Sequence, residues 1–94
     1  MPFPVLHIQR VHSGIYGWQI SLGGHVLAQD DGLASIAECL KQALHDFSEE
    51  THAVEIRYRG IGLGTYPTQA LQAAPSDFAD RIVALFAEVM DNRI

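Results

Sequence analysis

The chain has 94 residues, enough for one modest domain, so residues 1–94 are expected to form a single small globular unit. A composition of 48% hydrophobic and 18% charged residues is typical of globular proteins and excludes a disordered chain. Six Lys and Arg against eleven Asp and Glu give a net charge of −5, which repels a phosphate backbone, so no nucleic-acid partner is expected.

The first third of the chain predicts three strands. Residues 4–12 and 16–22 follow the two-residue apolar period of a strand with one buried face. Gly23 and Gly24 then match a two-residue hairpin turn, because both central positions of the favoured turn need a positive φ. The turn leads into a third strand at residues 25–28, and the three strands are expected to form an antiparallel meander.

An acidic turn at Asp30 and Asp31 predicts the start of a helix near Gly32 or Leu33, because a carboxylate there can cap free backbone amides. From Leu33 to Phe47 the apolar side chains fall within an arc of about 120° at the helical period. This face is expected to pack on the core.

The second half of the chain predicts one more strand and one more helix. Residues 52–59 alternate, with polar side chains on one face, and the glycine-rich residues 60–74 predict a bulged or looped excursion. Ser76 is the expected N-cap of a last helix that runs to about Asp91. The fold class predicted is α+β: an antiparallel sheet of about four strands with two helices on one face, in the order β-β-β-α-β-α.

Residues able to carry chemistry are scattered. None of the five histidines has the spacing that pairs two imidazoles on one helical face, so no metal and no other cofactor is expected. The alternative is a site assembled through space from dispersed histidines: His7, His25, His45 or His52. Arg57 with Arg59 is the one candidate basic patch.

Cys39 is the sole cysteine, which excludes an intramolecular disulfide and favours a cytoplasmic location. It falls at the edge of the apolar arc of the first helix, where it is expected to pack as a small hydrophobe. No apolar run approaches the length needed to cross a bilayer, so no membrane partner is expected.

The glycines at 60, 62 and 64 lack the spacing and the lysine of a phosphate-binding loop. They let the chain bend or allow a partner backbone to approach closely. Gly60, Gly62, Gly64 and Tyr66 are therefore the predicted interaction loop.

Residues 14–50 combine a glycine-containing hairpin, an acidic turn and an amphipathic segment from Leu33 to Leu44. In this layout the segment resembles the HicB-type antitoxin domain, although Leu22-Gly23-Gly24-His25 stands where that family has a Pro-Asp-Leu-Pro-Gly turn. The resemblance implies a β-β-β-α-β core, similar to a partial RNase H fold, that sequesters a small basic RNA-cleaving toxin.

Two hypotheses of function follow. The first is a non-enzymatic protein-interaction module whose partner is another protein or a second copy of the chain. An edge strand or the glycine-rich segment would make the contact, by strand pairing or close backbone approach. The alternative is a small-molecule-binding domain or small enzyme with a histidine-containing site near Gly60–Gly64, using His7, His25 or His52.

Overall fold

The computed structural model describes residues 3–47 and 51–91. The elements are β1 (Val5–His12), β2 (Ile15–Leu22), β3 (His25–Leu33), α1 (Ile36–His45), β4 (Ala53–Tyr58), β5 (Ile61–Pro67), α2 (Thr68–Ala73) and α3 (Pro75–Asp91). The predicted α+β class is confirmed. Over these described ranges the sheet has five strands rather than about four, and there are three helices rather than two.

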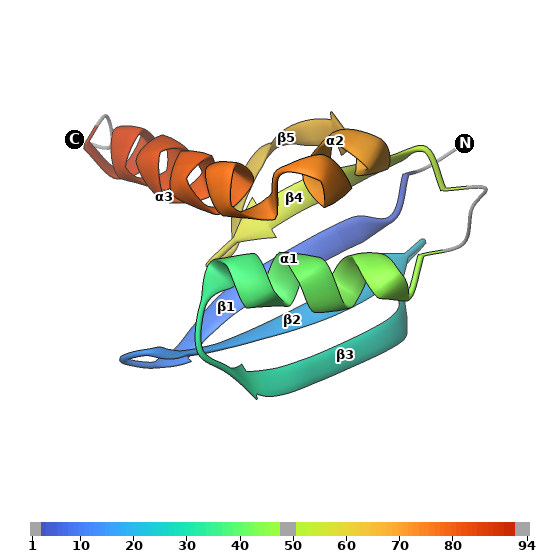
Figure 1. Cartoon of the computed structure of the whole chain (residues 1–94), viewed down its shortest axis with the longest axis horizontal. Helices are drawn as coiled ribbons and strands as arrows, with labels where there is room; N and C mark the ends of the chain where they lie inside the picture. Colours follow the sequence, from blue (N-terminus) through green and yellow to red (C-terminus); the bar gives the residue numbers. More distant parts are fainter. Residues whose placement is uncertain (1–2, 48–50, 92–94) are drawn as a thin grey trace.

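The sheet is mixed, with the strand order β3-β2-β1-β4-β5. Neighbouring strands are antiparallel except β1 and β4, which run parallel, so the prediction of a purely antiparallel sheet was wrong. The reason is the crossover through α1, which carries the chain from the β3 edge to the far side of β1. Figure 1 shows α1, α2 and α3 in one layer over the sheet.

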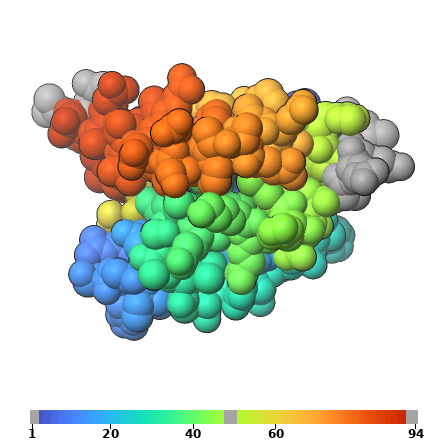
Figure 2. All heavy atoms as spheres, in the orientation of Figure 1, coloured from blue at the N-terminus to red at the C-terminus, as the bar shows by residue number. Residues whose placement is uncertain are grey.

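The core lies between the sheet and this helical layer. Its side chains come from alternate positions of the strands and from one face of α1, as the two apolar periods predicted. In Figure 2 the side chains of α1, α2 and α3 cover this face of the sheet. The opposite face of the sheet carries the polar side chains of the strands and has no helix of residues 3–47 and 51–91 on it.

The Gly23–Gly24 hairpin is confirmed, with φ of 58° and 85° at the two glycines. The predicted start of the first helix was wrong: β3 continues through Asp30, Asp31 and Gly32, and α1 begins only at Ile36. Ser35 and Glu38 form a capping box there, in which the Ser35 hydroxyl accepts from the Glu38 amide and the Glu38 carboxylate accepts from the Ala34 amide.

The glycine-rich excursion was also predicted wrongly, because residues 61–67 form β5 and residues 68–73 form α2. Ser76 is not an N-cap, since α3 already begins at Pro75, whose fixed φ suits the first position of a helix. None of the helices in the described ranges is both long and apolar enough to cross a membrane.

Candidate functional site

The predicted interaction loop is a hairpin. Gly60 lies in the turn between β4 and β5, and Gly62 and Gly64 lie within β5. Tyr66 folds back over Gly64, donates a 2.7 Å hydrogen bond to the carbonyl oxygen of Leu63, and stacks edge-on against Phe78. Gly64 and Tyr66 thus have a role in local packing. Contact between this hairpin and a partner stays a prediction.

The histidines are dispersed over the sheet and its flanks. His7 lies within β1, His25 opens β3 at the sheet edge, and His52 precedes β4 on the other side of β1. Among residues 3–47 and 51–91, no three His, Cys, Asp or Glu side chains come close enough to hold a metal ion. His7 therefore lies inside the sheet, with a neighbouring strand on each side.

His7 lies in the middle of the uncovered sheet face. Its neighbours across the strands are Gln19 on β2 and Arg57 on β4, and its Nε2 lies 3.3 Å from the Ser21 hydroxyl. Partial burial, followed by the charge of Arg57, lowers the pKa of His7, while Glu55 acts in the opposite sense. The neutral imidazole is therefore the favoured form in the folded state.

A shallow hollow of about 430 Å³ opens on the same face, beside Gly17 on β2. Polar side chains of three neighbouring strands line it, together with one valine: His7, Gln9, Val11, Gln19, Gln29 and Asp31. Across the strands, Nε2 of Gln19 donates a 3.4 Å hydrogen bond to Oε1 of Gln29. The hollow offers hydrogen-bond donors and acceptors to a polar ligand.

The depressed pKa of His7 predicts a loss of stability on acidification. Since the folded-state pKa lies below the ordinary 6.5, the unfolded chain takes up a proton at His7 first as the pH falls. The folded state is then penalised progressively from about pH 6.5 down through the lower folded-state pKa. A His7→Gln variant should show a flatter decline in its urea midpoint between pH 7.5 and 5, whereas Gln9→Ala on the same face should keep the native slope.

Cys39 is fully buried in the core under α1, as its position in the apolar arc predicted. Burial raises the pKa of its thiol to about 11, and the carboxylates of Glu38 and Asp30 add to the rise. The thiol therefore remains protonated at neutral pH and acts as a packing group.

The predicted basic pair Arg57 and Arg59 is split between two surfaces. Arg57 lies on the uncovered face, where its Nε is 2.5 Å from the Glu55 carboxylate. Arg59 has a positive φ of 52° in the β4–β5 turn, which takes its side chain toward the helical layer and 5.1 Å from the ring centre of Phe86. The two arginines therefore do not form one patch.

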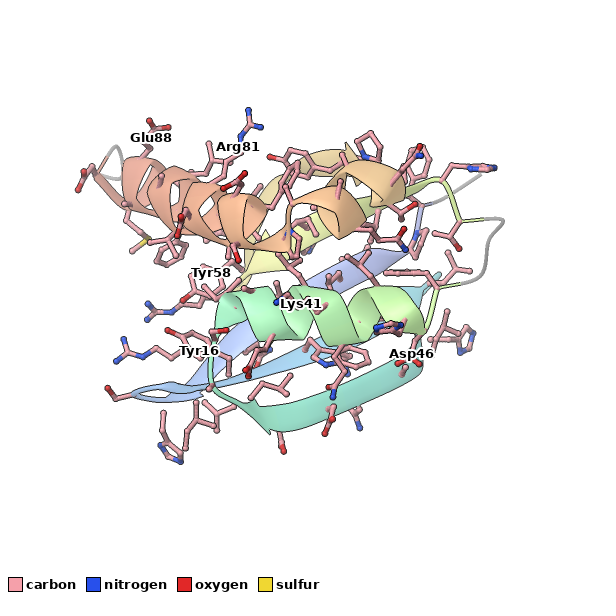
Figure 3. All side chains as sticks on the ribbon, in the orientation of Figure 1. Tyr16, Lys41, Asp46, Tyr58, Arg81 and Glu88 are labelled. Atoms are coloured by element: carbon pink, nitrogen blue, oxygen red, sulfur yellow. The ribbon has the colours of Figure 1, made fainter. Side chains whose placement is uncertain are left out.

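Sequence reasoning missed a basic and aromatic cluster at this end of the sheet. We define the Arg59 cluster as Arg10, Tyr16, Tyr58, Arg59 and Phe86. Arg10 and Tyr16 are direct cross-strand partners, and Tyr58 meets the Phe86 ring edge-on at 5.0 Å. Figure 3 shows Tyr16 and Tyr58 at the same end of the sheet, beside the start of α1. The strand order brings these residues together, and no local motif marks them.

Strand β3 is the second feature that sequence reasoning described incompletely. It is an edge strand, and seven of its nine residues are exposed. Val26 and Leu27, with 52% and 60% of their surface exposed, stand next to each other on it.

Comparisons with protein families, with curated proteins and with solved structures found no match.

Proposed function

We propose that this chain is a non-enzymatic protein-interaction module whose edge strand β3 pairs with an extended segment of a basic protein partner. The observation that carries the proposal is the exposure of β3 together with its adjacent anchors Val26 and Leu27. An edge strand presents unpaired backbone N–H and C=O groups, which a partner strand can complete, while exposed aliphatic side chains supply apolar contact.

The two sheet edges differ in what they offer. The other edge, β5, carries no large hydrophobic side chain with comparable exposure and is followed directly by α2. On β3 the register shifts near Leu27, where two residues oppose one on β2, and this bulge displaces an apolar side chain outward. Strand β3 is therefore the edge that combines open backbone groups with apolar anchors.

Charge selects the partner. Asp30 and Asp31 follow the apolar pair on the same strand, and the whole chain carries a net charge of −5. Such a surface attracts a segment rich in Lys and Arg and repels an acidic one. Pairing with a second copy of the chain would bring together two molecules of like charge, so a basic partner is favoured over a homodimer.

The resemblance to the HicB-type antitoxin domain supports the same class of partner. The order β1-β2-β3-α1-β4 is the β-β-β-α-β layout that the resemblance implies. In that family the domain sequesters a small basic toxin, which agrees in charge with the partner proposed for β3. Fold likeness does not by itself carry function, so the experiment below tests the strand and not the family.

Selection of displayed random peptides on the purified protein tests the proposal. Enriched sequences are expected to alternate apolar and basic residues, as a strand that pairs with β3 requires. A Val26→Ser/Leu27→Ser double variant should weaken their binding about tenfold or more, because two exposed aliphatic anchors are lost. The matched control is Val83→Ser/Met90→Ser on α3, whose exposed fractions are 49% and 46%.

Two further results separate strand pairing from simple hydrophobic adhesion. A selected peptide that is N-methylated at alternate residues should lose binding, because it can no longer donate the ladder hydrogen bonds on one edge. Peptides without basic residues, or binding that survives the β3 variant, would contradict the proposal. Light scattering of the protein alone tests for a homodimer. A dimer that the β3 variant dissociates would show that a second copy of the chain, and not a basic partner, covers the strand.

A second candidate function rests on the hollow at Gly17. Its volume of about 430 Å³ and its lining by His7 and three glutamines fit a small polar ligand. A histidine-containing site of this kind would lie on the β1–β3 side of the sheet, whereas the sequence suggests a site near Gly60–Gly64. Shifts confined to His7, Gln19 and Gln29 in an NMR screen of polar metabolites would favour it, and their absence would leave it without a ligand.

A further inference from the structure

The Arg59 cluster lies on the helix side of the sheet, where β1 and β4 end and β2 begins. Ile8 and Tyr58 are partners in the parallel pair of β1 and β4, and the Arg59 amide donates a 2.9 Å hydrogen bond to the Ile8 carbonyl oxygen. Arg10, two residues after Ile8, is the direct partner of Tyr16 on β2. The sheet thus holds two arginines and two tyrosines side by side on adjacent strands.

Aromatic packing fixes one side of the cluster. The Phe86 ring of α3 meets Tyr58 at an interplanar angle of 77°, and the guanidinium of Arg59 lies over the same Phe86 ring. A guanidinium held over an aromatic face is restricted before a ligand arrives, so it loses less freedom on binding. Arg59 is therefore pre-oriented.

Neither arginine of the cluster has an acidic partner. Although the chain has nearly twice as many acidic as basic residues, no carboxylate of residues 3–47 and 51–91 pairs with Arg10 or Arg59, and Arg59 instead hydrogen-bonds the Tyr58 side chain. Their charges act on the phenol of Tyr58, whose pKa is nevertheless raised, first by burial and next by Tyr16. The cluster is a locally positive, hydroxyl-bearing surface on an acidic protein.

The backbone supports a role beyond packing. Arg59 and Gly60 occupy the two central positions of the β4–β5 turn, with φ of 52° and 83°. A turn with positive φ at both positions favours Asn-Gly, and a long side chain at the first position is strained there. Arg59 is exposed and charged, so core packing does not explain why this strained residue is arginine. Backbone strain of this kind is often found at functional sites.

We propose that the Arg59 cluster binds a phosphoryl group, with Arg10, Arg59 and the hydroxyl of Tyr16 as its ligands. Two guanidinium groups and a hydroxyl supply charge-assisted hydrogen bonds to the several oxygens of a tetrahedral dianion. Tyr58 and Phe86 act as positioning residues that hold Arg59. None of these residues lies on β3, so this proposal is tested separately from the proposed pairing of β3 with a partner strand.

The test is an NMR titration of the native protein with inorganic phosphate at pH 7.5, against sodium chloride at matched ionic strength. Saturable shifts at residues 10, 16 and 59, with a dissociation constant of about 1 mM, are expected. Arg59→Asn should weaken binding at least about tenfold, and it should raise the melting temperature by about 2–4 °C because Asn suits the turn. Arg10→Gln should also weaken binding.

The matched control is Arg81→Gln on α3, since Arg81 stands 6.0 Å over the Phe78 ring and Figure 3 shows it on the far side of α3 from Tyr16. That variant should bind phosphate as the native protein does. O-Phospho-L-tyrosine distinguishes the source of the group: tighter binding than inorganic phosphate indicates a phosphorylated aromatic ligand, and equal binding indicates a free phosphate. Shifts that chloride reproduces, or an affinity unchanged in Arg59→Asn, would overturn the proposal.

Discussion

Replacing Leu40 with alanine is expected to lower the free energy of unfolding by about 3 kcal/mol, the largest effect of any single substitution considered for this chain. Leu40 is fully buried on the core-facing side of α1, where it packs between the helix and the sheet. Truncation removes buried methyl groups and leaves a cavity that the rigid sheet below can fill only in part. Urea denaturation followed by far-UV circular dichroism measures the change.

Lys41→Ala is the matched control, because residue 41 is the exposed neighbour on the same helix and alanine is also a good helix former. Its free energy of unfolding should stay within about 0.5 kcal/mol of the native value. Equal losses in the two variants would show that helix propensity, not core packing, dominates α1. An unchanged midpoint in Leu40→Ala would contradict the buried position of this residue.

The elements with a strong apolar period could be predicted from sequence. The core face of α1, the alternation of β2 and the Gly23–Gly24 turn follow from local rules, since side-chain spacing and turn dihedrals are properties of neighbouring residues. The start of α1 was predicted wrongly because Asp30 and Ser35 are both residue types that cap helices. The capping box of Ser35 with Glu38 prevails in the structure.

Strand β5 was missed because its alternating glycines suppress every strand signal. Gly62 and Gly64 weaken β propensity, and only Leu63 between them is buried. What forms the strand is pairing with β4, closed by the turn at Arg59 and Gly60. Such pairing is a tertiary interaction, which overrides local preference and leaves no periodic trace in a seven-residue segment.

The candidate sites depend on strand order, which no local pattern specifies. Arg10 and Tyr58 are 48 positions apart in sequence and come together because β4 inserts beside β1 in parallel. The same order separates His25 from His52, so these two members of the alternative histidine site lie on opposite sides of β1. Conversely, the exposed edge of β3 could be anticipated as an edge strand, but its apolar anchors depend on a bulge.

Replacing Gly17 with valine is expected to cost about 2 kcal/mol of stability and to loosen the second half of β3. Gly17 is buried on β2 at a second register shift, between Tyr16 and Trp18, away from the bulge at Leu27. A Cβ atom there would lie 3.1 Å from the Asp31 Cβ and 3.2 Å from the Asp30 carbonyl oxygen. Backbone cannot yield as a flexible side chain can, so β3 must shift outward. Hydrogen exchange should accelerate at the amides of residues 30–33.

Gly62→Val on β5 is the control, since a Cβ at Gly62 meets no atom within 4 Å and valine favours a strand. That variant should be at least as stable as the native protein. Gly17→Val should also fill the hollow beside His7 and weaken binding of any peptide that pairs with β3, because the strand is displaced. If Gly17→Val instead matched the native protein in stability and exchange, the close approach of β3 to β2 at this glycine would not constrain residues 30–33 of the strand.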